Sequence, residues 1–337
     1  MIADSALGEV LRVTADGRLL AAAGQNVGFT NGDGGPASRA RLRSPRDLAV
    51  LHGDGYAIAD ADDNRVRRVL PDGTIQTLAG TGVSGFSGDG GPAAAALLSQ
   101  PTALAVATDG ALLVADRGNG RIRRIGPDGT ISTVAGGGAG PTPALAAELV
   151  LPTGVAAMPD GGFLVAEAAR IRRIGPDGTI ATVGGTGKAG FNVGRAPANA
   201  VALAYPTAIA ALTDGRALVA DTLNDRVRLL DLARSTLLTV AGRGVPGPPG
   251  TPEPALGATL KPPDAPDADA LIVTARPKPS PARTSGRGGS EGAFARLVGG
   301  AGHALARLVG GCNSGGAHGA FERAPSGYCA QPGDPDP

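Results

Sequence analysis

The chain has 337 residues, and its 31 lysine and arginine residues almost balance its 30 aspartate and glutamate residues. This balance gives no long-range attraction to nucleic acid or to an anionic membrane surface. Three histidines nearly exclude a multi-histidine zinc site, and two cysteines are too few for a metal knuckle. The 55 glycines and 28 prolines suit a β-rich chain with many turns.

From its first residues, the chain repeats a short apolar strand that ends in an acid. The acids lie 51 to 56 residues apart, and a faded copy follows at Ile272–Thr274. A period of this size indicates an array of supersecondary units, none of which can bury its apolar face alone. The clear copies are Ile2–Asp4, Ile58–Asp60, Val114–Asp116, Val165–Glu167 and Val219–Asp221.

The third repeat shows the internal plan of each unit. Apolar runs at 101–106, 111–115, 121–125 and 130–135 are separated by polar turns, two of which contain Asp-Gly. Short β-branched runs separated by Asp-Gly are typical of hairpins, because glycine reaches positive φ freely. The unit is therefore predicted to be a four-stranded antiparallel meander, which is the blade of an all-β propeller.

The two ends of the chain decide the expected number of blades. The chain opens at the second strand of a blade, and there are six second strands but five clear copies of each other strand. We predict six blades, with five full repeats and partial ones at the ends. Two tail segments, 296–300 and 307–311, faintly resemble a fourth strand. A five-bladed closure and an open arc are the alternatives.

Several motifs recur in one order and carry a resemblance. Val-Ala-Asp is followed by Arg-Ile-Arg-Arg and Pro-Asp-Gly-Thr-Ile, and 88–93 reads Gly-Asp-Gly-Gly-Pro-Ala. This pattern resembles the NHL-repeat family of β-propellers over residues 2–243, and more poorly over 256–275. The resemblance implies a propeller fold, used in that family as a binding platform and less often as an enzyme.

The composition changes after about residue 245. We predict an NHL-like propeller over residues 1–275 and a disordered tail over 276–337, which is rich in Gly, Pro and Ala. Cys312 and Cys329 both lie in this tail, and their pairing is left open. No secretion signal heads the chain and no apolar run reaches membrane-spanning length. Because the chain opens inside a blade, we expect missing N-terminal sequence, and the compartment stays open, secreted or cell-surface origin included.

A candidate binding face follows from the topology of a meander. The turns between second and third strands emerge at the same end as the crossovers between blades, and the Asp-Gly hairpins emerge at the other. The first end has longer and more varied loops, where propellers usually hold ligands. The candidate residues there are Asp60, Asp63, Asn64, Asp116, Asn119, Asp221, Asn224, Phe29, Phe86 and Phe191.

The third strands are rich in arginine, which allows two interpretations. Arginines stacked around a ring could grip phosphates and bind RNA. We favour pairing with the acids that recur at second-strand ends and in Pro-Asp-Gly turns, because each blade repeats both. An unpaired basic surface would favour RNA. The arginines are Arg65, Arg67, Arg68, Arg121, Arg123, Arg124, Arg170, Arg172, Arg173, Arg226 and Arg228.

The Gly-rich segments 29–37 and 86–93 could cradle a phosphate or a cation. No Gly-Lys-Ser/Thr follows them, and each lies between the fourth strand of one repeat and the first strand of the next. We therefore interpret them as crossovers in which glycine and proline set the turns.

The function predicted from these patterns is a non-catalytic scaffold that binds a protein or a small molecule on one face of the ring. We expect a monomer without a cofactor, and no nucleic-acid partner. The alternative is a calcium-dependent propeller hydrolase or lyase, because Asp and Asn oxygens abound. A channel ringed by unpaired carboxylates would favour that alternative. No Ser-His-Asp or Cys-His arrangement is built by the sequence.

Overall fold

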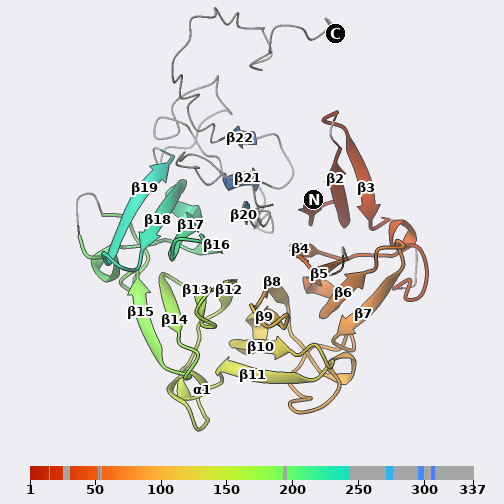
Figure 1. The fold of residues 1–337 in the computed structure, drawn as a ribbon, viewed down its shortest axis with the longest axis horizontal. Coiled ribbons are helices and arrows are strands. Elements are labelled where there is room, and N and C mark those ends of the chain that lie inside the picture. The colour runs from red at the N-terminus through yellow and green to blue at the C-terminus, as the bar shows by residue number, and fades with distance from the viewer. Residues whose placement is uncertain are drawn as a thin grey trace, which may run out of the picture.

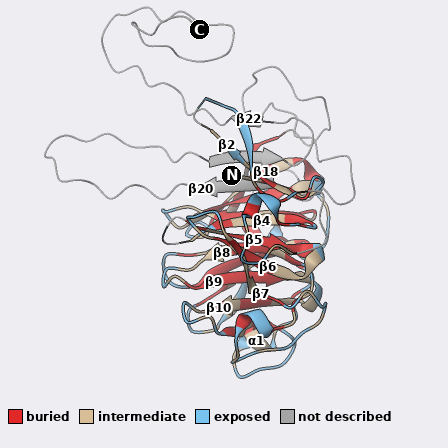
Figure 2. Cartoon of the chain, turned by 90° about the vertical axis from the view of Figure 1, so that its right-hand side faces the viewer, coloured by how far each residue is buried: buried red, intermediate tan, exposed pale blue. Residues whose placement is uncertain are grey.

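The computed structural model describes residues 1–14, 16–25, 31–51, 53, 55–192, 196–242, 271–275, 295–299 and 305–307. In these residues antiparallel sheets stand around a central axis and form a β-propeller (Figure 1). The predicted all-β fold class is confirmed. Seen from the side, buried residues run through the strands and exposed residues gather in the loops (Figure 2).

Residues 2–242 form five blades, numbered here along the chain. Blade 1 has three strands, β1 (Ile2–Asp4), β2 (Glu9–Val13) and β3 (Leu19–Ala23). Each of the other four has four strands, which follow chain order from the axis outward.

Blade 2 contains β4 (Pro45–Val50), β5 (Tyr56–Asp60), β6 (Arg65–Val69) and β7 (Ile75–Ala79). Blade 3 contains β8 (Pro101–Val106), β9 (Leu112–Asp116), β10 (Arg121–Ile125) and β11 (Ile131–Gly136). Blade 4 contains β12 (Pro152–Ala157), β13 (Phe163–Glu167), β14 (Arg170–Ile174) and β15 (Ile180–Gly184). Blade 5 contains β16 (Pro206–Ala211), β17 (Arg216–Asp221), β18 (Arg226–Asp231) and β19 (Thr236–Ala241).

The blade count differs from the expected six blades with five full repeats. Four sheets are complete, and the tail adds a three-stranded sheet of β20 (Leu271–Ala275), β21 (Ala295–Gly299) and β22 (Leu305–Arg307). The faded repeat copy in β20 was expected to be a second strand. Instead, β20 is an edge strand and lies beside the innermost strand β16. The arginine-rich third strand and the Pro-Asp-Gly turn, which fix the register in blades 2 to 4, have no counterpart after residue 275.

The predicted boundary at residue 275 stays a prediction. The pairing of β20 with β21 joins residues on its two sides, and both tail cysteines lie outside the described residues. Helices are short in the described part of the chain. They are η1 (Ala37–Arg39), η2 (Ala61–Asp63), η3 (Ala93–Ala95), η4 (Arg117–Asn119), η5 (Ala198–Ala200), η6 (Thr222–Asn224) and α1 (Pro143–Ala146). None of these described helices is long and apolar enough to cross a membrane.

The core lies between blades rather than within them. In β9, Leu112 and Val114 pack in a cluster shared with blade 2, whereas Leu113 and Ala115 pack in a cluster shared with blade 4. Alternate residues of a strand point to opposite faces of its sheet, so both faces of a central blade are buried. Two similar clusters join blades 1 and 2 and blades 4 and 5. This is why a single repeat cannot fold alone.

The Gly-rich crossovers run along the outer edge of the next blade, which agrees with their interpretation as connections. Pro92 forms a bridge with Thr130, the residue before β11, and the N–H of Ala93 donates to the carbonyl of Gly129 at 2.9 Å. Gly88 has φ +93°, and a Cβ there would lie 2.7 Å from the Cβ of Ala96. Only glycine fits this close approach.

Candidate binding face

The turns after the second strands and the crossovers emerge at one end of the propeller, as expected. In blade 2 the end of β5 lies opposite the start of β4, because Asp60 pairs with Pro45. The start of β6 lies opposite the end of β7, because Val66 pairs with Ala79. We call this end the crossover face. It comprises turns 5–8, 61–64, 117–120, 168–169 and 222–225 and the described parts of crossovers 24–44, 80–100, 137–151 and 185–205.

Three of the predicted site residues, Asp60, Asp116 and Asp221, are fully buried at the ends of their second strands. The backbone N–H of Arg43 donates to Asp60 Oδ1 at 2.9 Å, and the equivalent amides of Ser99 and Ala204 donate to the other two carboxylates at 2.7 and 2.8 Å. Asp60 Oδ1 also accepts from the N–H of Ser44 at 2.8 Å. Each carboxylate thus ties the entry of the first strand to the end of the second strand. The recurring acid therefore has a structural role within its own blade.

Two of the predicted asparagines extend this arrangement to the crossover. The side-chain amide of Asn119 donates to Asp116 Oδ2 at 2.7 Å and to the carbonyl of Gly85 at 2.7 Å. Asn224 likewise donates to Asp221 and, at 2.9 Å, to the carbonyl of Gly190. These side chains hold the loop that arrives from the preceding blade.

Asn64 has a different role from Asn119 and Asn224, although all three were predicted as candidate residues of the same face. It has φ 49° and ends η2, in the place that Gly120 and Asp225 take in their blades with φ 60° and 50°. Asparagine tolerates this left-handed conformation better than most residues. Asp63, one residue earlier, stands where Asn119 stands in blade 3, and it forms an ion pair with Arg65.

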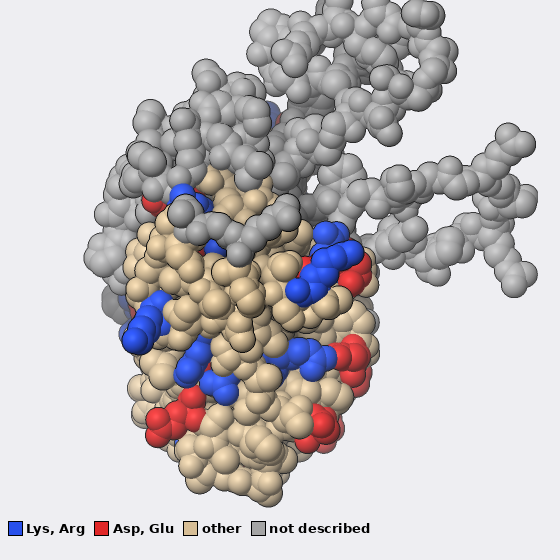
Figure 3. All heavy atoms as spheres, turned by 90° about the vertical axis from the view of Figure 1, so that its left-hand side faces the viewer, with Lys and Arg blue, Asp and Glu red and all other residues tan. Residues whose placement is uncertain are grey.

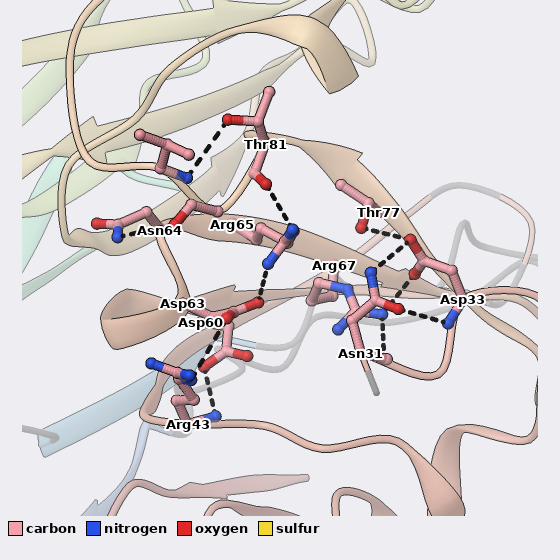
Figure 4. A network of polar contacts seen from close by, with 12 residues as sticks. Asn31, Asp33, Arg43, Asp60, Asp63, Asn64, Arg65, Arg67, Thr77 and Thr81 are labelled. Atoms are coloured by element: carbon pink, nitrogen blue, oxygen red, sulfur yellow. Dashed lines mark hydrogen bonds and ion pairs between the residues drawn. The ribbon is translucent and has the colours of Figure 1, made fainter. Parts of the chain in front are cut away.

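A buried arginine joins blade 2 to the crossover before it (Figure 4). Arg67 is fully buried, and its Nη2 donates to Asp33 Oδ1 at 2.5 Å and to the carbonyl of Asn31 at 2.8 Å. Thr77 donates to the other oxygen of Asp33 at 2.7 Å. We call this set the blade 2 clamp.

Blade 3 repeats the clamp with the same spacing. Arg123, also fully buried, donates to Asp89 Oδ1 at 2.8 Å, and Thr133 donates to Asp89 Oδ2 at 2.8 Å. Arg123 Nη1 also lies 3.6 Å from Asp116 Oδ2. In both clamps the aspartate precedes the arginine by 34 residues and the threonine by 44.

The expected pairing of third-strand arginines with acids is therefore seen, but with an additional partner. The expected partners were the acids at second-strand ends and in Pro-Asp-Gly turns. Asp33 and Asp89 belong instead to the Gly-Asp-Gly-Gly-Pro-Ala crossovers. The constant spacing of 34 residues between aspartate and arginine in both repeats could have indicated this pairing from the sequence.

Blades 4 and 5 have no such aspartate in the described parts of their crossovers, and glutamate takes over in blade 4. Glu167 is fully buried, and its Oε1 accepts from Arg170 Nε at 2.8 Å and from Arg172 Nη1 at 3.2 Å. Its Oε2 accepts from the N–H of Val150 at 2.7 Å. Glu167 thus forms hydrogen-bonded ion pairs with two third-strand arginines, whereas Asp116 approaches Arg123 only at 3.6 Å.

Shortening this side chain tests the compensation. We expect Glu167→Asp to lower the free energy of unfolding by about 1.5–3 kcal/mol, because hydrogen bonds between charged groups are lost in a buried place. Urea denaturation measures the change. Asp160→Asn is the control, because Asp160 pairs with Arg173 at the surface with 49% of its side chain exposed. Equal effects of the two variants would contradict the role given to Glu167.

The buried carboxylates of this face have perturbed pKa values. Burial raises the pKa of Asp60 to about 6, against the amide hydrogen bonds from Ser44 and Arg43, which lower it. Burial also raises the pKa of Asp116 and of Asp221. Asp60 differs in that its Oδ2 accepts no hydrogen bond, whereas Asp116 Oδ2 accepts one from Asn119.

The two described phenylalanines among the predicted site residues lie on arginines of the next blade. The guanidinium of Arg121 stands 3.9 Å from the ring centre of Phe86, and that of Arg226 stands 3.9 Å from Phe191. Such contacts stabilise by about 0.5–1 kcal/mol at exposed sites. Each ring also keeps about 40% of its surface exposed. Phe29 lies outside the described residues.

Exposed apolar side chains gather on the crossover face, and only the phenylalanines among them were predicted from the sequence. Of the twelve large apolar residues that are exposed in the described part of the chain, seven lie in its turns and crossovers. The other exposed residues could have been found in the sequence as single apolar residues within polar loops. The seven are Leu7, Val83, Phe86, Val150, Leu151, Phe191 and Leu223.

Three residues that enter the innermost strands on this face have an unfavourable backbone. Gln100, Leu151 and Tyr205 have φ of 48° to 49°, although each precedes a proline and none is glycine. The left-handed conformation costs roughly 1–2 kcal/mol for such residues. Arg117 of blade 3 donates to Gln100 Oε1 at 3.1 Å and to the hydroxyl of Tyr205, before blade 5, at 3.2 Å.

Charge is mixed over the surface. Figure 3 shows basic and acidic side chains on the same side of the molecule, separated by other residues, rather than one continuous basic area. Among the described residues, no group of three or more His, Cys, Asp or Glu side chains could hold a metal ion.

Known proteins match part of this chain. A family model of the Teneurin NHL domain matches residues 64–126. Teneurin-4 from Homo sapiens is 44% identical over an alignment of 103 residues, and the match covers 26% of this chain and 4% of that protein. Teneurin-1 from Mus musculus is 39% identical over 102 residues, with the same two shares. The chain thus matches a small part of the length of these relatives.

Solved structures also match this chain. The streptogramin B lyase structure has 16% identity and a TM-score of 0.45, with 71% of this chain and 64% of that chain covered. XC5397 from Xanthomonas campestris, described as a gluconolactonase, has 18% identity and a TM-score of 0.46, with 70% and 69% covered. A chain of the nidogen/laminin complex has 17% identity and a TM-score of 0.47, with 70% and 77% covered.

Proposed function

We propose that this NHL-repeat β-propeller is a non-catalytic scaffold that binds a protein through its crossover face. The observation that carries the proposal is the gathering of seven exposed apolar side chains in the loops of that face. Large exposed apolar residues that cluster on a folded protein are typical of interaction sites. Aromatic rings such as Phe86 and Phe191 are enriched at such sites, because they bury much area with few rotatable bonds.

Two further features support a preformed face. Strained residues cluster where the surrounding structure holds them for a function, and Gln100, Leu151 and Tyr205 are three such residues. Hydrogen bonds from Asn119 and Asn224 to the crossovers hold the loops in place. A face that is ordered before binding loses less conformational entropy when a partner binds.

The polar residues of this face support binding rather than catalysis. Asp60, Asp116 and Asp221 accept hydrogen bonds from the amides of their own blades. At Asp116 and Asp221 both carboxylate oxygens accept hydrogen bonds, which supports the scaffold over a calcium-dependent hydrolase or lyase, whereas at Asp60 only Oδ1 does.

Substitution of the face tests the proposal. We expect the double variant Val83→Asp with Leu223→Asp to give at least tenfold less cross-linked protein partner than the parent chain. Both side chains are more than 60% exposed on the crossover face, so a charge there would oppose binding of an apolar partner surface. Quantitative cross-linking with mass spectrometry measures partners of the full chain. Val50→Asp is the control, since Val50 is 73% exposed at the opposite end, where β4 ends. Partners that persist in the double variant, or that are lost equally in the control, would contradict the proposal.

A metal-free scaffold also predicts an outcome for calcium. We expect calorimetric unfolding of the full chain to give the same melting temperature in calcium and in chelator. A cation that binds only the native state raises the melting temperature as its concentration rises. A shift of several degrees would therefore support the calcium-dependent enzyme instead.

A further inference from the structure

The turn of blade 3 contains an arginine that pairs with no carboxylate in the described part of the chain. Arg117 begins η4 and is half-buried, and its Nη1 donates to Gln100 Oε1 at 3.1 Å. Its Nη2 donates to the hydroxyl of Tyr205 at 3.2 Å. A guanidinium has five N–H donors, so Arg117 keeps its Nε–H and one hydrogen on each Nη for a further acceptor. The arginines of the two clamps, in contrast, each bond an aspartate.

The two partners of Arg117 also keep donors that no described residue uses. Because a guanidinium only donates, Gln100 presents its oxygen to Arg117, which leaves the side-chain NH2 of Gln100 unused among the described residues. The hydroxyl of Tyr205 accepts from Arg117, and its own hydrogen bonds to no acceptor in that part of the chain. Three side chains thus offer N–H and O–H groups around one positive charge. Such a set complements an oxyanion, since hydrogen bonds to a charged acceptor are shorter and stronger than neutral ones.

The backbone holds this arrangement before any ligand binds. Gln100 and Tyr205 both have the left-handed conformation, and the N–H of Gln100 donates to Asn64 Oδ1 at 3.0 Å. Arg117 reaches past blade 4 to the entry of blade 5. The turn of blade 4 is the short segment 168–169, where blade 3 has 117–120. A set of donors that is fixed in advance loses less conformational entropy when a ligand binds.

An apolar side chain lies between the two polar ones around the axis. Gln100, Leu151 and Tyr205 stand directly before the first prolines of blades 3, 4 and 5, and the innermost strands β8, β12 and β16 contact one another in that order. Leu151 is 44% exposed. A ligand that fits both features carries one negative charge beside an apolar group. A carboxylate meets this description, whereas a phosphate brings up to two charges to a site with one guanidinium.

We propose that Arg117, Gln100 and Tyr205 form a receptor for a carboxylate of the protein partner, beside an apolar group that packs on Leu151. This inference rests on the proposed function of the crossover face and names the chemistry of its partner. The unused hydrogens of the guanidinium, the O–H of the tyrosine and the NH2 of the glutamine donate to the carboxylate. The carboxylate thereby supplies Arg117 with the acidic partner that the described chain does not.

Isovalerate, a small carboxylate with a branched apolar end, tests the site on the full chain without an identified partner. We expect it to shift the NMR signal of the Arg117 Nε–H in a saturable way, the signal being assigned by its absence from Arg117→Lys. Isovaleramide has nearly the same shape without the charge and should cause no shift at the same concentrations. Inorganic phosphate at matched ionic strength should bind more weakly than isovalerate.

Two substitutions locate the site, with binding measured from the NMR signals of isovalerate itself. Arg117→Gln should weaken binding at least tenfold, because the hydrogen bonds from a charged donor are lost. Gln100→Glu places a carboxylate of this chain on Arg117, so it should also weaken binding at least tenfold, without lowering the melting temperature. Arg124→Gln is the matched control, since it removes the same charge from the same blade at the surface pair with Asp109.

The outcomes separate this inference from the proposed function. Isovaleramide that binds as well as isovalerate, phosphate that binds more tightly, or binding that is unchanged in Arg117→Gln would overturn the carboxylate receptor. The proposed function is tested separately, by the cross-linked partners of the double variant at Val83 and Leu223. Arg117→Gln should also give less cross-linked partner than Arg124→Gln, and equal amounts would show that the carboxylate does not come from the partner.

Discussion

Replacing Arg123 with alanine is expected to lower the free energy of unfolding by about 3–5 kcal/mol, which is the usual cost of removing one partner of a buried ion pair. The guanidinium is fully buried and bonds Asp89 at 2.8 Å and the carbonyl of Ser87 at 3.1 Å. Its loss leaves the fully buried Asp116 without its neighbouring charge. It also opens space beneath the ring of Phe86, which lies 4.9 Å from this guanidinium.

The next residue in the strand provides a matched control. Arg124 pairs with Asp109 at the surface, where 34% and 57% of the two side chains are exposed. Surface pairs of this kind contribute about 0–1 kcal/mol, so Arg124→Ala should change stability little. Urea denaturation of the two variants and the parent chain measures the contrast. If Arg123→Ala costs no more than Arg124→Ala, the clamp does not hold blade 3 to its crossover.

The strands of each blade could be predicted from the sequence because their signals are local. In the third repeat, the apolar runs at 101–106 and 121–125 coincide with β8 and β10, and the Asp-Gly turns separate neighbouring strands. Alternation of side chains then places successive residues of β9 in different interblade clusters. Fold class follows from local pattern and repetition alone.

The blade count and the role of β20 depended on information that is not local. Ile272–Thr274 has the apolar pattern of a second strand, but pattern alone cannot say which strand lies beside it. Position in a sheet is decided by pairing partners, and β20 pairs with β21 from far along the chain. A register that no turn motif fixes is weakly specified by sequence.

The candidate face was predicted as a location, whereas the roles of its residues needed the structure. Topology brings the end of β5 and the end of β7 to the same end of the blade. Which acid reaches Arg67 depends on the path of the crossover, so Asp33 was not recognised as its partner. Likewise, the left-handed backbone at Asn64 separates it from Asn119, which has the same side chain but a different position in its turn.

The stability of the protein should also carry a pH dependence from Asp60. The pKa of this carboxyl is raised to about 6 by burial, from an ordinary value of 3.8. Between these values the folded chain binds more protons than the unfolded chain, so the free energy of unfolding falls as pH rises. The full contribution is present below about pH 4 and is lost above about pH 6. One pKa unit corresponds to about 1.4 kcal/mol, so the loss is on the order of 3 kcal/mol.

Asp60→Asn isolates this contribution, because asparagine stays neutral at every pH and its oxygen can still accept from the amides of Ser44 and Arg43. We expect the stability of the variant relative to the parent chain to rise by about 3 kcal/mol between pH 4 and pH 7, measured by urea denaturation at steps of pH. Burial also raises the pKa of Asp47 to about 6, but Asp47 titrates in both proteins, so its effect on the free energy of unfolding cancels in the difference between them.

Asp72→Asn is the control with the opposite sign, since hydrogen bonds from Thr74 lower the pKa of that exposed carboxyl. Its contribution should therefore appear only below pH 4, as stability lost from the parent chain on acidification. Parallel profiles for the parent chain and Asp60→Asn between pH 4 and pH 7 would contradict this prediction, because they would show that Asp60 stays ionised in its buried place, with the charge of Arg67 offsetting the effect of burial on its pKa.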